Sequence, residues 1–372
     1  MRCFLRVFPL RWFLQVAFLI AIVLGISLWR SRACPGENST ETIAPGLTLT
    51  KFQHRIAAGP VQVYVVRANF EAGWRMHMVP AADAVMKRLP VSAIAAQHNA
   101  PAAVNGGFFA YEGAAIGAVC VAGEWVRLPW KNRTAIGFRP DGRGRIANIQ
   151  ATARVQFGDG STVTVANLNG YPSANAVAVL TPRFGNSYKL RARELALEVE
   201  NNVVVAKVET GTARIRPGSW TLVAHGSARA QVENMGIGQT ATFKVETTPA
   251  DWKDFPTILG AGPRLLRDGV IEVTSVEEEF RPDVIQRGPR TGVGMDGDGN
   301  PVFVVADGFG ECSVGLTLPE LALVMQQAGV RDALHMDCGP SSVLVVNNRA
   351  VNRPSWGKEP TVPNALVLTR SE

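Results

Sequence analysis

Alternation of apolar and polar positions predicts β-strands over most of this chain. The segment VQVYVVR, residues 61–67, alternates with the period of two that a strand gives, whereas residues 91–99 have the spacing of a short helix. A short apolar strand then ends at Asn105. From about residue 116 to 250, short apolar runs are separated by turn dipeptides such as Asp141-Gly142. The middle of the chain is therefore predicted to be β-rich.

Near the C-terminus the pattern predicts strand, helix and strand. NPVFVVADG, residues 300–308, is a strand that ends at Asp307, and ALHMD, residues 333–337, is a second strand that ends at Asp337. TLPELALVMQQAG, residues 317–329, opens with a capping box, carries an apolar stripe and closes on glycine, as a helix does. This order implies a right-handed crossover between two parallel strands. The expected fold class is α+β: mixed sheets, a β-rich middle and a C-terminal βαβ unit that carries the site at the carboxyl ends of its strands.

An apolar segment precedes the rest of the chain. Residues 12–29 contain no charge and would span roughly 27 Å as a helix, close to the thickness of a bilayer's hydrocarbon core. Residues 1–33 are therefore predicted to be a signal-anchor or a signal peptide, residues 34–46 a polar tether, and residues 47–372 the folded domain. The anchor would place that domain on the periplasmic or extracellular side of a membrane. Cleavage near Ala33 would secrete it instead.

Charge and cysteine usage exclude two classes of protein. The net charge is +7, but five arginines lie in the first 36 residues, which have no acidic residue, so only +2 remains for the exported part. A nucleic-acid-binding protein would carry its basic excess in the folded domain, so a nucleic-acid partner is not expected. The five cysteines form no CxxC pair and no metal-ligand spacing with the five histidines, which argues against a structural zinc site.

The two aspartates at the strand ends are the main candidates for chemistry. Parallel strands would bring Asp307 and Asp337 to the same carboxyl edge, where ligands bind in open α/β sheets. If the strands are neighbours, the aspartates start roughly 5 Å apart and can share a proton, bind a divalent cation, or act as acid and base. The alternative is that one of them only caps a turn.

Other polar positions have a functional and a structural interpretation. Arg290, beside a proline-stiffened turn, could clamp a phosphate with two hydrogen bonds, or it could simply be solvated. Ser341 and Ser342 could donate hydrogen bonds to an anion or satisfy turn backbone. Gly106 and Gly107 allow a tight turn or close approach of the backbone to a ligand.

Several short motifs, in one order along residues 47–370, resemble the phosphodiester glycosidase family. They are VNGGFF at 104–109, LGAGPRLLRDG at 259–269, RGPRTGVG at 287–294, VVADG at 304–308, GLTLPELALVMQQAGVRDALHMDCGPSS at 315–342 and VNRPSWGKEPTVPNALVL at 351–368.

The resemblance implies an exported or membrane-anchored hydrolase. It would cleave a sugar from a sugar-1-phosphodiester in envelope or exopolysaccharide glycans, with Asp337 as nucleophile or base and Asp307 as its acid partner or as a cation ligand. The implied substrate-binding residues are Asn105, Gly106, Gly107, Arg290, Thr291, Ser341 and Ser342. No cofactor is implied apart from a divalent cation at the two aspartates.

The sequence departs from the family pattern at four positions. Cys338 and Pro340 stand where the family usually has glycines, Gly288 stands where a histidine is common, and Phe309 where a basic residue often follows Asp307-Gly308. These changes keep a second interpretation open, a non-catalytic glycan-binding envelope protein on the same scaffold.

Cys338 raises two further hypotheses. With His335 it could form the nucleophile and base of a thiol hydrolase. With Cys312 it could form a disulfide between the loops that follow the two strands, which would stabilise the fold by roughly 3 to 4 kcal/mol. The alternative to the disulfide is two free thiols.

Overall fold

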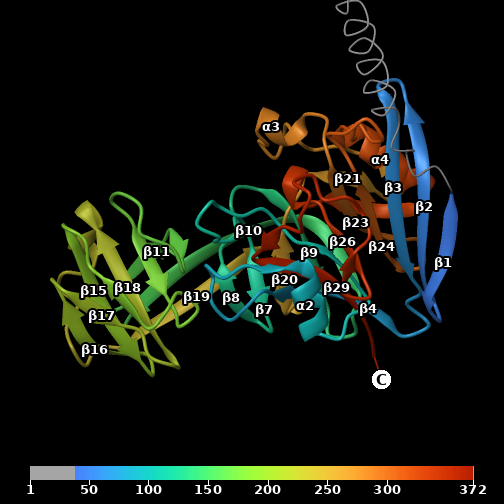
Figure 1. Cartoon of the computed structure of the whole chain (residues 1–372). Helices are drawn as coiled ribbons and strands as arrows, with labels where there is room; N and C mark the ends of the chain where they lie inside the picture. Colours follow the sequence, from blue (N-terminus) through green and yellow to red (C-terminus); the bar gives the residue numbers. More distant parts are fainter. Residues whose placement is uncertain (1–37, 372) are drawn as a thin grey trace, which may run out of the picture. The chain divides into compact units, whose positions relative to one another are not determined.

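The computed structural model describes residues 38–371 of the chain (Figure 1). These residues form several β-sheets and only a few short helices, so the fold is mostly β and consistent with the expected α+β class. The predicted signal-anchor or signal peptide, residues 1–33 with the apolar segment 12–29, lies outside the described residues. Within residues 38–371, no helix is both long enough and apolar enough to cross a membrane.

An eight-stranded sheet holds both candidate aspartates at its strand ends. Its strand order is β1-β2-β3-β24-β23-β25-β21-β22. Because β24 and β25 both pair antiparallel with β23, they run in the same direction, but they are not hydrogen-bonded neighbours. The strands are β1 (Ser39–Ala44), β2 (Leu47–Ile56), β3 (Gly59–Ala68), β21 (Arg264–Arg267), β22 (Val270–Ile271), β23 (Arg290–Asp296), β24 (Pro301–Ala306) and β25 (Val330–His335).

Alternating side chains of this sheet enter two different cores. In β24, Val302 and Val304 face a core that includes Leu321 and Met325 of helix α4 (Leu318–Gln327), whereas Phe303 faces the central core of the protein. Both faces of the strand are thus buried, which explains its nearly continuous apolar sequence. Figure 1 shows α4 beside the strands of this sheet. The predicted helix at 317–329 is confirmed, and its capping box is formed by Thr317 and Glu320.

Two further sheets complete the central core. A five-stranded sheet has the order β27-β26-β6-β29-β4, and the core side of a seven-stranded sheet contains Ile136 and Leu259. Helix α2 (Val91–Gln97) confirms the helix predicted at 91–99, and β6 ends at Asn105 as predicted. The strands are β4 (Trp74–Pro80), β6 (Ala102–Asn105), β26 (Leu344–Val346), β27 (Arg349–Ala350) and β29 (Asn364–Arg370) in the first sheet, and β7 (Val119–Val121), β8 (Glu124–Arg127), β9 (Arg133–Phe138), β10 (Gly144–Phe157), β11 (Thr162–Val165), β19 (Ala241–Thr248) and β20 (Thr257–Gly260) in the second.

The middle of the chain is β-rich, as predicted, and has a hydrophobic core of its own. Strand β10 pairs with β9 through its first half and with β11 and β19 through its second half. The apolar side chains of that second half pack against a five-stranded sheet, β12-β13-β18-β15-β16. The remaining strands are β12 (Asn167–Leu168), β13 (Val177–Leu180), β15 (Glu194–Glu200), β16 (Val203–Val208), β18 (Ser219–His225), the pair β14 (Ser187–Lys189) and β17 (Thr212–Arg214), and the pair β5 (Leu89–Pro90) and β28 (Thr361–Val362). The short helices are α3 (Pro282–Ile285), η1 (Gly226–Gln231), η2 (Ala250–Asp254) and η3 (Gly339–Ser341).

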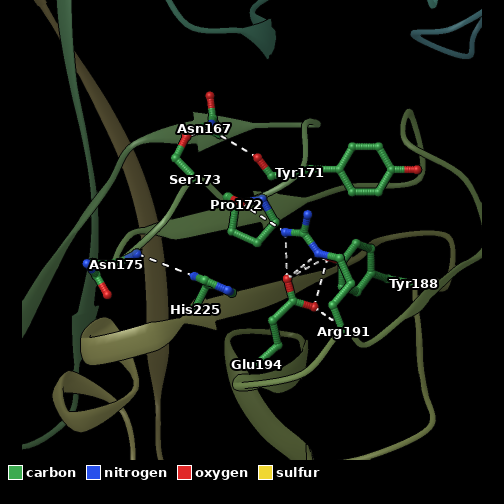
Figure 2. Close-up of polar contacts among 9 residues, drawn as sticks. All are labelled: Asn167, Tyr171, Pro172, Ser173, Asn175, Tyr188, Arg191, Glu194 and His225. Carbon is green, nitrogen blue, oxygen red and sulfur yellow. Dashed lines mark hydrogen bonds and ion pairs between the residues drawn. The ribbon is translucent and has the colours of Figure 1, made fainter.

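A buried carboxylate is fully satisfied in this middle part. Glu194 is 0% exposed and accepts hydrogen bonds from the Tyr188 hydroxyl at 3.0 Å and from Arg191 Nε at 2.8 Å. Figure 2 shows both side chains reaching the same carboxylate, with Tyr171 nearby. A buried charge with a paired cation and hydrogen bonds is a structural element, so this cluster needs no ligand to explain it.

The predicted tether extends too far. Residues Ser39–Ala44 form strand β1, which pairs antiparallel with β2, so the folded part begins before Leu47. The first four residues of β1 are exposed, and Thr40 Oγ1 lies 3.1 Å from Thr50 Oγ1, whereas Ile43 and Ala44 at the end of the strand pack against the central core. Because only the last two residues of this edge strand are apolar and partly buried, the strand shows no alternation of apolar and polar positions in the sequence.

Candidate active site

Asp307 and Asp337 follow β24 and β25 at the same edge of the eight-stranded sheet. The expectation that these strands are neighbours is wrong, because β23 lies between them. Two strand spacings put the strand ends about 10 Å apart rather than 5 Å. At this separation the placement of the strands does not imply that the two carboxyl groups share a proton or bind the same cation. The two aspartates also have different surroundings.

Asp337 is half-buried and titrates near neutrality. Its Oδ1 accepts a hydrogen bond from the Cys338 N–H at 2.9 Å, and the Ser341 hydroxyl bonds the same carboxyl group. Burial raises the pKa of Asp337 to about 6, against the lowering effect of these two hydrogen bonds. A carboxyl group with this pKa suits proton transfer or nucleophilic attack at neutral pH.

Asn105 and Thr291 hold the main chain at Asp337. Asn105 is fully buried at the end of β6, and its Nδ2 donates to the Asp337 carbonyl at 2.8 Å. Its Oδ1 accepts hydrogen bonds from Thr291 Oγ1 at 2.8 Å and from the Val343 N–H at 3.2 Å. The structure therefore brings Asn105, Thr291 and Asp337 together, but the polar atoms of the first two are already used within the protein.

The two glycines after Asn105 approach protein atoms closely. Gly107 N–H donates to Asn364 Oδ1 at 3.0 Å, and Gly106 N–H donates to the Asn364 carbonyl at 3.0 Å. A Cβ on Gly106 would lie 1.9 Å from Asn364 Oδ1, and one on Gly107 would lie 2.4 Å from the Gly260 carbonyl oxygen. The predicted close approach is thus to neighbouring strands, and these N–H groups do not face a phosphate.

Asp307 fastens the loop that follows β27. It is 6% exposed and accepts hydrogen bonds from Tyr64 O–H at 3.2 Å, Asn352 Nδ2 at 3.1 Å and Arg353 N–H at 3.0 Å. Burial raises the pKa of Asp307, and these same hydrogen bonds oppose the rise. Asp307 therefore holds Asn352 and Arg353 in the loop that follows β27.

Sequence reasoning missed the residues that surround Asp307. Asn352 and Arg353 lie in the motif VNRPSWG, which supported the family resemblance, so a signal for them was present. Tyr64 lies within the apolar run of β3, and no motif in the sequence marks it as a contact of Asp307.

Arg290 is a buried anchor for the loop before β23. It is 1% exposed, and its Nε donates to the Leu316 carbonyl at 2.9 Å and its Nη1 to the Val284 carbonyl at 2.7 Å. Its Nη2 donates to the Gln286 carbonyl. The predicted two-pronged phosphate clamp is not formed by this arrangement, because the donors that it needs hold backbone carbonyls.

The two serines differ in accessibility. Ser341 is partly exposed and bonds the Asp337 carboxyl group, so it lies at the candidate site. Ser342 is 1% exposed, and its Oγ has no hydrogen-bond partner among the described residues.

Cys338 is a free thiol, so the predicted Cys312–Cys338 disulfide is wrong. Cys312 is disulfide-bonded, but not to Cys338. The prediction took β24 and β25 to be adjacent, whereas β23 separates the loops that follow them. The Cys338 side chain instead hydrogen-bonds Arg290.

The same surroundings disfavour the thiol hydrolase. Burial raises the pKa of the Cys338 thiol to about 12, so the thiolate needed for attack is scarce. His335 is fully buried, and its pKa is lowered well below the usual value by burial and by nearby Arg290. Its Nε2 lies 3.5 Å from Arg290 Nη1.

The described residues show no ready-made metal centre. Among residues 38–371, no group of three or more His, Cys, Asp or Glu side chains is placed to hold a metal ion. The site thus consists of one carboxylate that can ionise near neutrality, a serine beside it, and buried residues that fix its position.

The C-terminal half of the chain resembles the phosphodiester glycosidase family. Residues 193–369 match the model of that family. No curated protein matches the sequence.

Solved structures share the fold. A hypothetical protein from Synechocystis superposes with a TM-score of 0.82 at 25% identity over 91% of this chain, which spans 65% of that protein's length. A Burkholderia pseudomallei protein named "Putative exported protein" superposes with a TM-score of 0.71 at 23% identity, and the match covers 83% of this chain and 74% of that protein. The third structure is the catalytic domain of zebrafish N-acetylglucosamine-1-phosphodiester alpha-N-acetylglucosaminidase, auto-inhibited by its pro-peptide. It superposes with a TM-score of 0.52 at 16% identity, and the match covers 90% of this chain and 88% of that domain.

Proposed function

We propose that this chain, whose residues 193–369 match the phosphodiester glycosidase family, is a hydrolase that cleaves a sugar from a sugar-1-phosphodiester in envelope or exopolysaccharide glycans. The observation that carries the proposal is the Asp337 carboxyl group. Asn105 holds the Asp337 main-chain carbonyl after β25, Ser341 bonds the carboxyl group itself, and the pKa of this carboxyl group is about 6. Of the two aspartates at this sheet edge, Asp337 is the partly exposed one, and its pKa is near neutrality.

The proposed reaction breaks the bond between the anomeric carbon and the phosphate oxygen. Asp337 either takes a proton from the attacking water or attacks the anomeric carbon itself, to form an ester that water then hydrolyses. The bonding electrons leave with the phosphate, which departs as a phosphomonoester. Because phosphate is a good leaving group, a second carboxylic acid is less necessary than charge stabilisation and positioning.

The surrounding residues have separate proposed roles. Ser341 donates a hydrogen bond at the reacting centre, and Arg353, whose side chain is exposed beside Asp307, supplies the cation for the phosphodiester. Asp307 is a positioning residue for the Arg353 loop. Arg290 and Thr291 support the site from within the protein.

The proposal includes export or anchoring. It rests on the uncharged segment at 12–29 and on the similarity to a protein named as exported. Fractionation of the full chain tests it, since an anchored protein stays with membranes after a high-salt wash and is released by detergent.

The activity is tested with a panel of substrates offered to the soluble part. The panel contains sugar-1-phosphodiesters, the matching phosphomonoesters and simple alkyl glycosides, each with and without chelator. Hydrolysis of the diesters alone supports the proposal. Because β23 separates Asp307 from Asp337, chelation is expected to leave the rate unchanged. Binding of the sugars without turnover of any diester would instead identify a non-catalytic glycan-binding protein.

A further inference from the structure

Two exposed aromatic rings lie in the loops that contain or contact Asp307. Phe309 is 66% exposed and follows Asp307 by two residues, and Trp356 is 73% exposed and follows Arg353 by three. The Arg353 N–H donates to Asp307 Oδ1 at 3.0 Å. Phe309 and Trp356 are therefore each only two or three residues away from Asp307 or from its hydrogen-bond partner Arg353. At about 3.8 Å per residue, this limits how far the backbone of either residue can lie from the Asp307 carboxylate.

The backbone of Phe309 is strained. Its φ is 61°, in the left-handed region that residues with a Cβ rarely adopt. Neither burial nor backbone preference explains a large apolar side chain there, because the ring is mostly exposed and glycine would fit the backbone better. Strained residues are concentrated at functional sites, where the surrounding structure holds them in place.

Gly288 leaves room for the Phe309 ring. A Cβ on Gly288 would lie 3.0 Å and 3.1 Å from two carbon atoms of that ring. Gly288 is itself fixed by paired backbone hydrogen bonds with Leu316, at 3.2 Å and 2.9 Å. The ring therefore lies on bare backbone and extends into solvent. Both positions depart from the pattern of the resembled family, and the two departures meet in space.

The loops that carry the two rings also contain exposed polar residues. Arg353, Glu311 and Lys358 are exposed in the same two loops, and glycines stand on both sides of Phe309. A protein partner would be expected to use a continuous apolar patch, which separate rings among charged residues do not provide. A sugar ring has one apolar face of C–H groups that packs on an aromatic ring, and hydroxyls that reach the polar residues around it.

We infer that Phe309, seated on Gly288, is the stacking surface for a sugar ring of the substrate. The inference rests on the proposed function, because it names the ligand contact of the same site. It makes Phe309 a substrate-binding residue.

Binding is measured separately from turnover. The probes are the methyl phosphodiesters of α-N-acetylglucosamine-1-phosphate and α-glucose-1-phosphate, titrated calorimetrically into Asp337→Asn protein. We expect Phe309→Gly to raise the Kd of the better probe about tenfold, the loss of one stacked aromatic contact. Phe309→Tyr, which keeps the ring, should restore the parent affinity. Tyr171→Ala, an exposed aromatic in another sheet region, is the control and should bind as the parent does (Figure 2).

A stability readout separates binding from a structural role. Glycine adopts the positive φ of residue 309 without strain, which offsets its greater freedom in the unfolded chain. The melting temperature of Phe309→Gly should therefore stay within about 3 °C of the parent. A larger drop would indicate that the ring holds the loop together, and would overturn the inference.

Gly288 gives a second, independent test. Gly288→Ala should weaken binding as Phe309→Gly does, because the added methyl group displaces the ring, and should have less than a twofold effect when Phe309 is already glycine. Full additivity of the two changes contradicts the seating on Gly288. An unchanged Kd in Phe309→Gly overturns the stacking role alone, whereas a wild-type chain that neither binds nor hydrolyses any diester overturns the proposed function and this inference with it.

Discussion

Asn105 Nδ2 donates a hydrogen bond of 2.8 Å to the Asp337 carbonyl oxygen, and so joins the end of β6 to the end of β25. The two strands belong to different sheets. Asn105 also accepts from Thr291 on β23, so three strand ends meet at one buried amide. The Asp337 carboxyl group therefore projects from backbone that two sheets hold in place, as the proposed catalytic role requires.

The raised pKa of Asp337 predicts an acidic limb in the pH profile. If the ionised carboxylate is the active form, kcat/KM should rise tenfold per pH unit up to about pH 6 and then level off. Measurement of kcat/KM from pH 4 to 8 checks this limb. A profile without a change near pH 6 would remove Asp337 from the chemistry.

The same pKa predicts the sign of a stability change. The folded-state pKa of about 6 lies above the ordinary value of 3.8, so the native state binds this proton more tightly. The stabilisation is fully present below the ordinary pKa and is lost as pH rises through 6. Asp337→Asn should therefore be at least as stable as the wild type at pH 7.5, with less difference at pH 4, as measured by urea unfolding.

Asp307→Asn separates positioning from acid catalysis. In wild-type Asp307, one carboxylate oxygen accepts a hydrogen bond from Tyr64, and the other accepts hydrogen bonds from Asn352 and Arg353. The substitution replaces one of these oxygens by an NH2 group, so at least one donor loses its acceptor. We expect a loss of about 2 kcal/mol in stability and a raised KM with kcat within tenfold of the wild type. A fall in kcat of more than a hundredfold with normal stability would show that Asp307 is a general acid instead. Tyr64→Phe removes one donor and should have a smaller effect.

The local signals of the sequence were sufficient for some elements and not for others. The capping box of Thr317 and Glu320 predicted α4, and strand ends predicted that Asp307 and Asp337 share an edge. The position of β23 between their strands could not be read, because chain order does not determine sheet order. Arg290 looks the same in a sequence whether it is solvated or 1% exposed. The contacts of Asn364 with the glycine turn join residues far apart in the chain and leave no local pattern.

Arg290→Lys should mainly destabilise the fold. A lysine cannot replace the hydrogen bonds from one guanidinium to the carbonyls of Val284, Gln286 and Leu316. The expected cost is about 3 kcal/mol, which thermal unfolding would show as a clear drop in melting temperature. Wild-type stability with a strongly raised KM would mean that Arg290 contacts the phosphate after all.

Arg353→Gln should weaken substrate binding without unfolding the loop. The backbone N–H of residue 353 still donates to Asp307, while the exposed cation is lost. KM should rise about tenfold, and less at high salt because screening already weakens the ion pair. Arg349→Gln removes an exposed arginine from β27 and is the matched control. Equal KM values in the two variants would exclude Arg353 from phosphate binding.

The central claim is that Asp337 drives cleavage of a sugar-phosphate bond, and phosphorus NMR of a sugar-1-phosphodiester incubated with the wild type and with Asp337→Asn tests it most directly. The wild type should convert the diester signal into that of a phosphomonoester, with one free sugar released per phosphate. Asp337→Asn should lower this rate by at least a hundredfold while unfolding at the same or a higher urea concentration. Conversion by Asp337→Asn at the wild-type rate, or an intact diester with the well-folded wild type across the whole panel, would contradict the account.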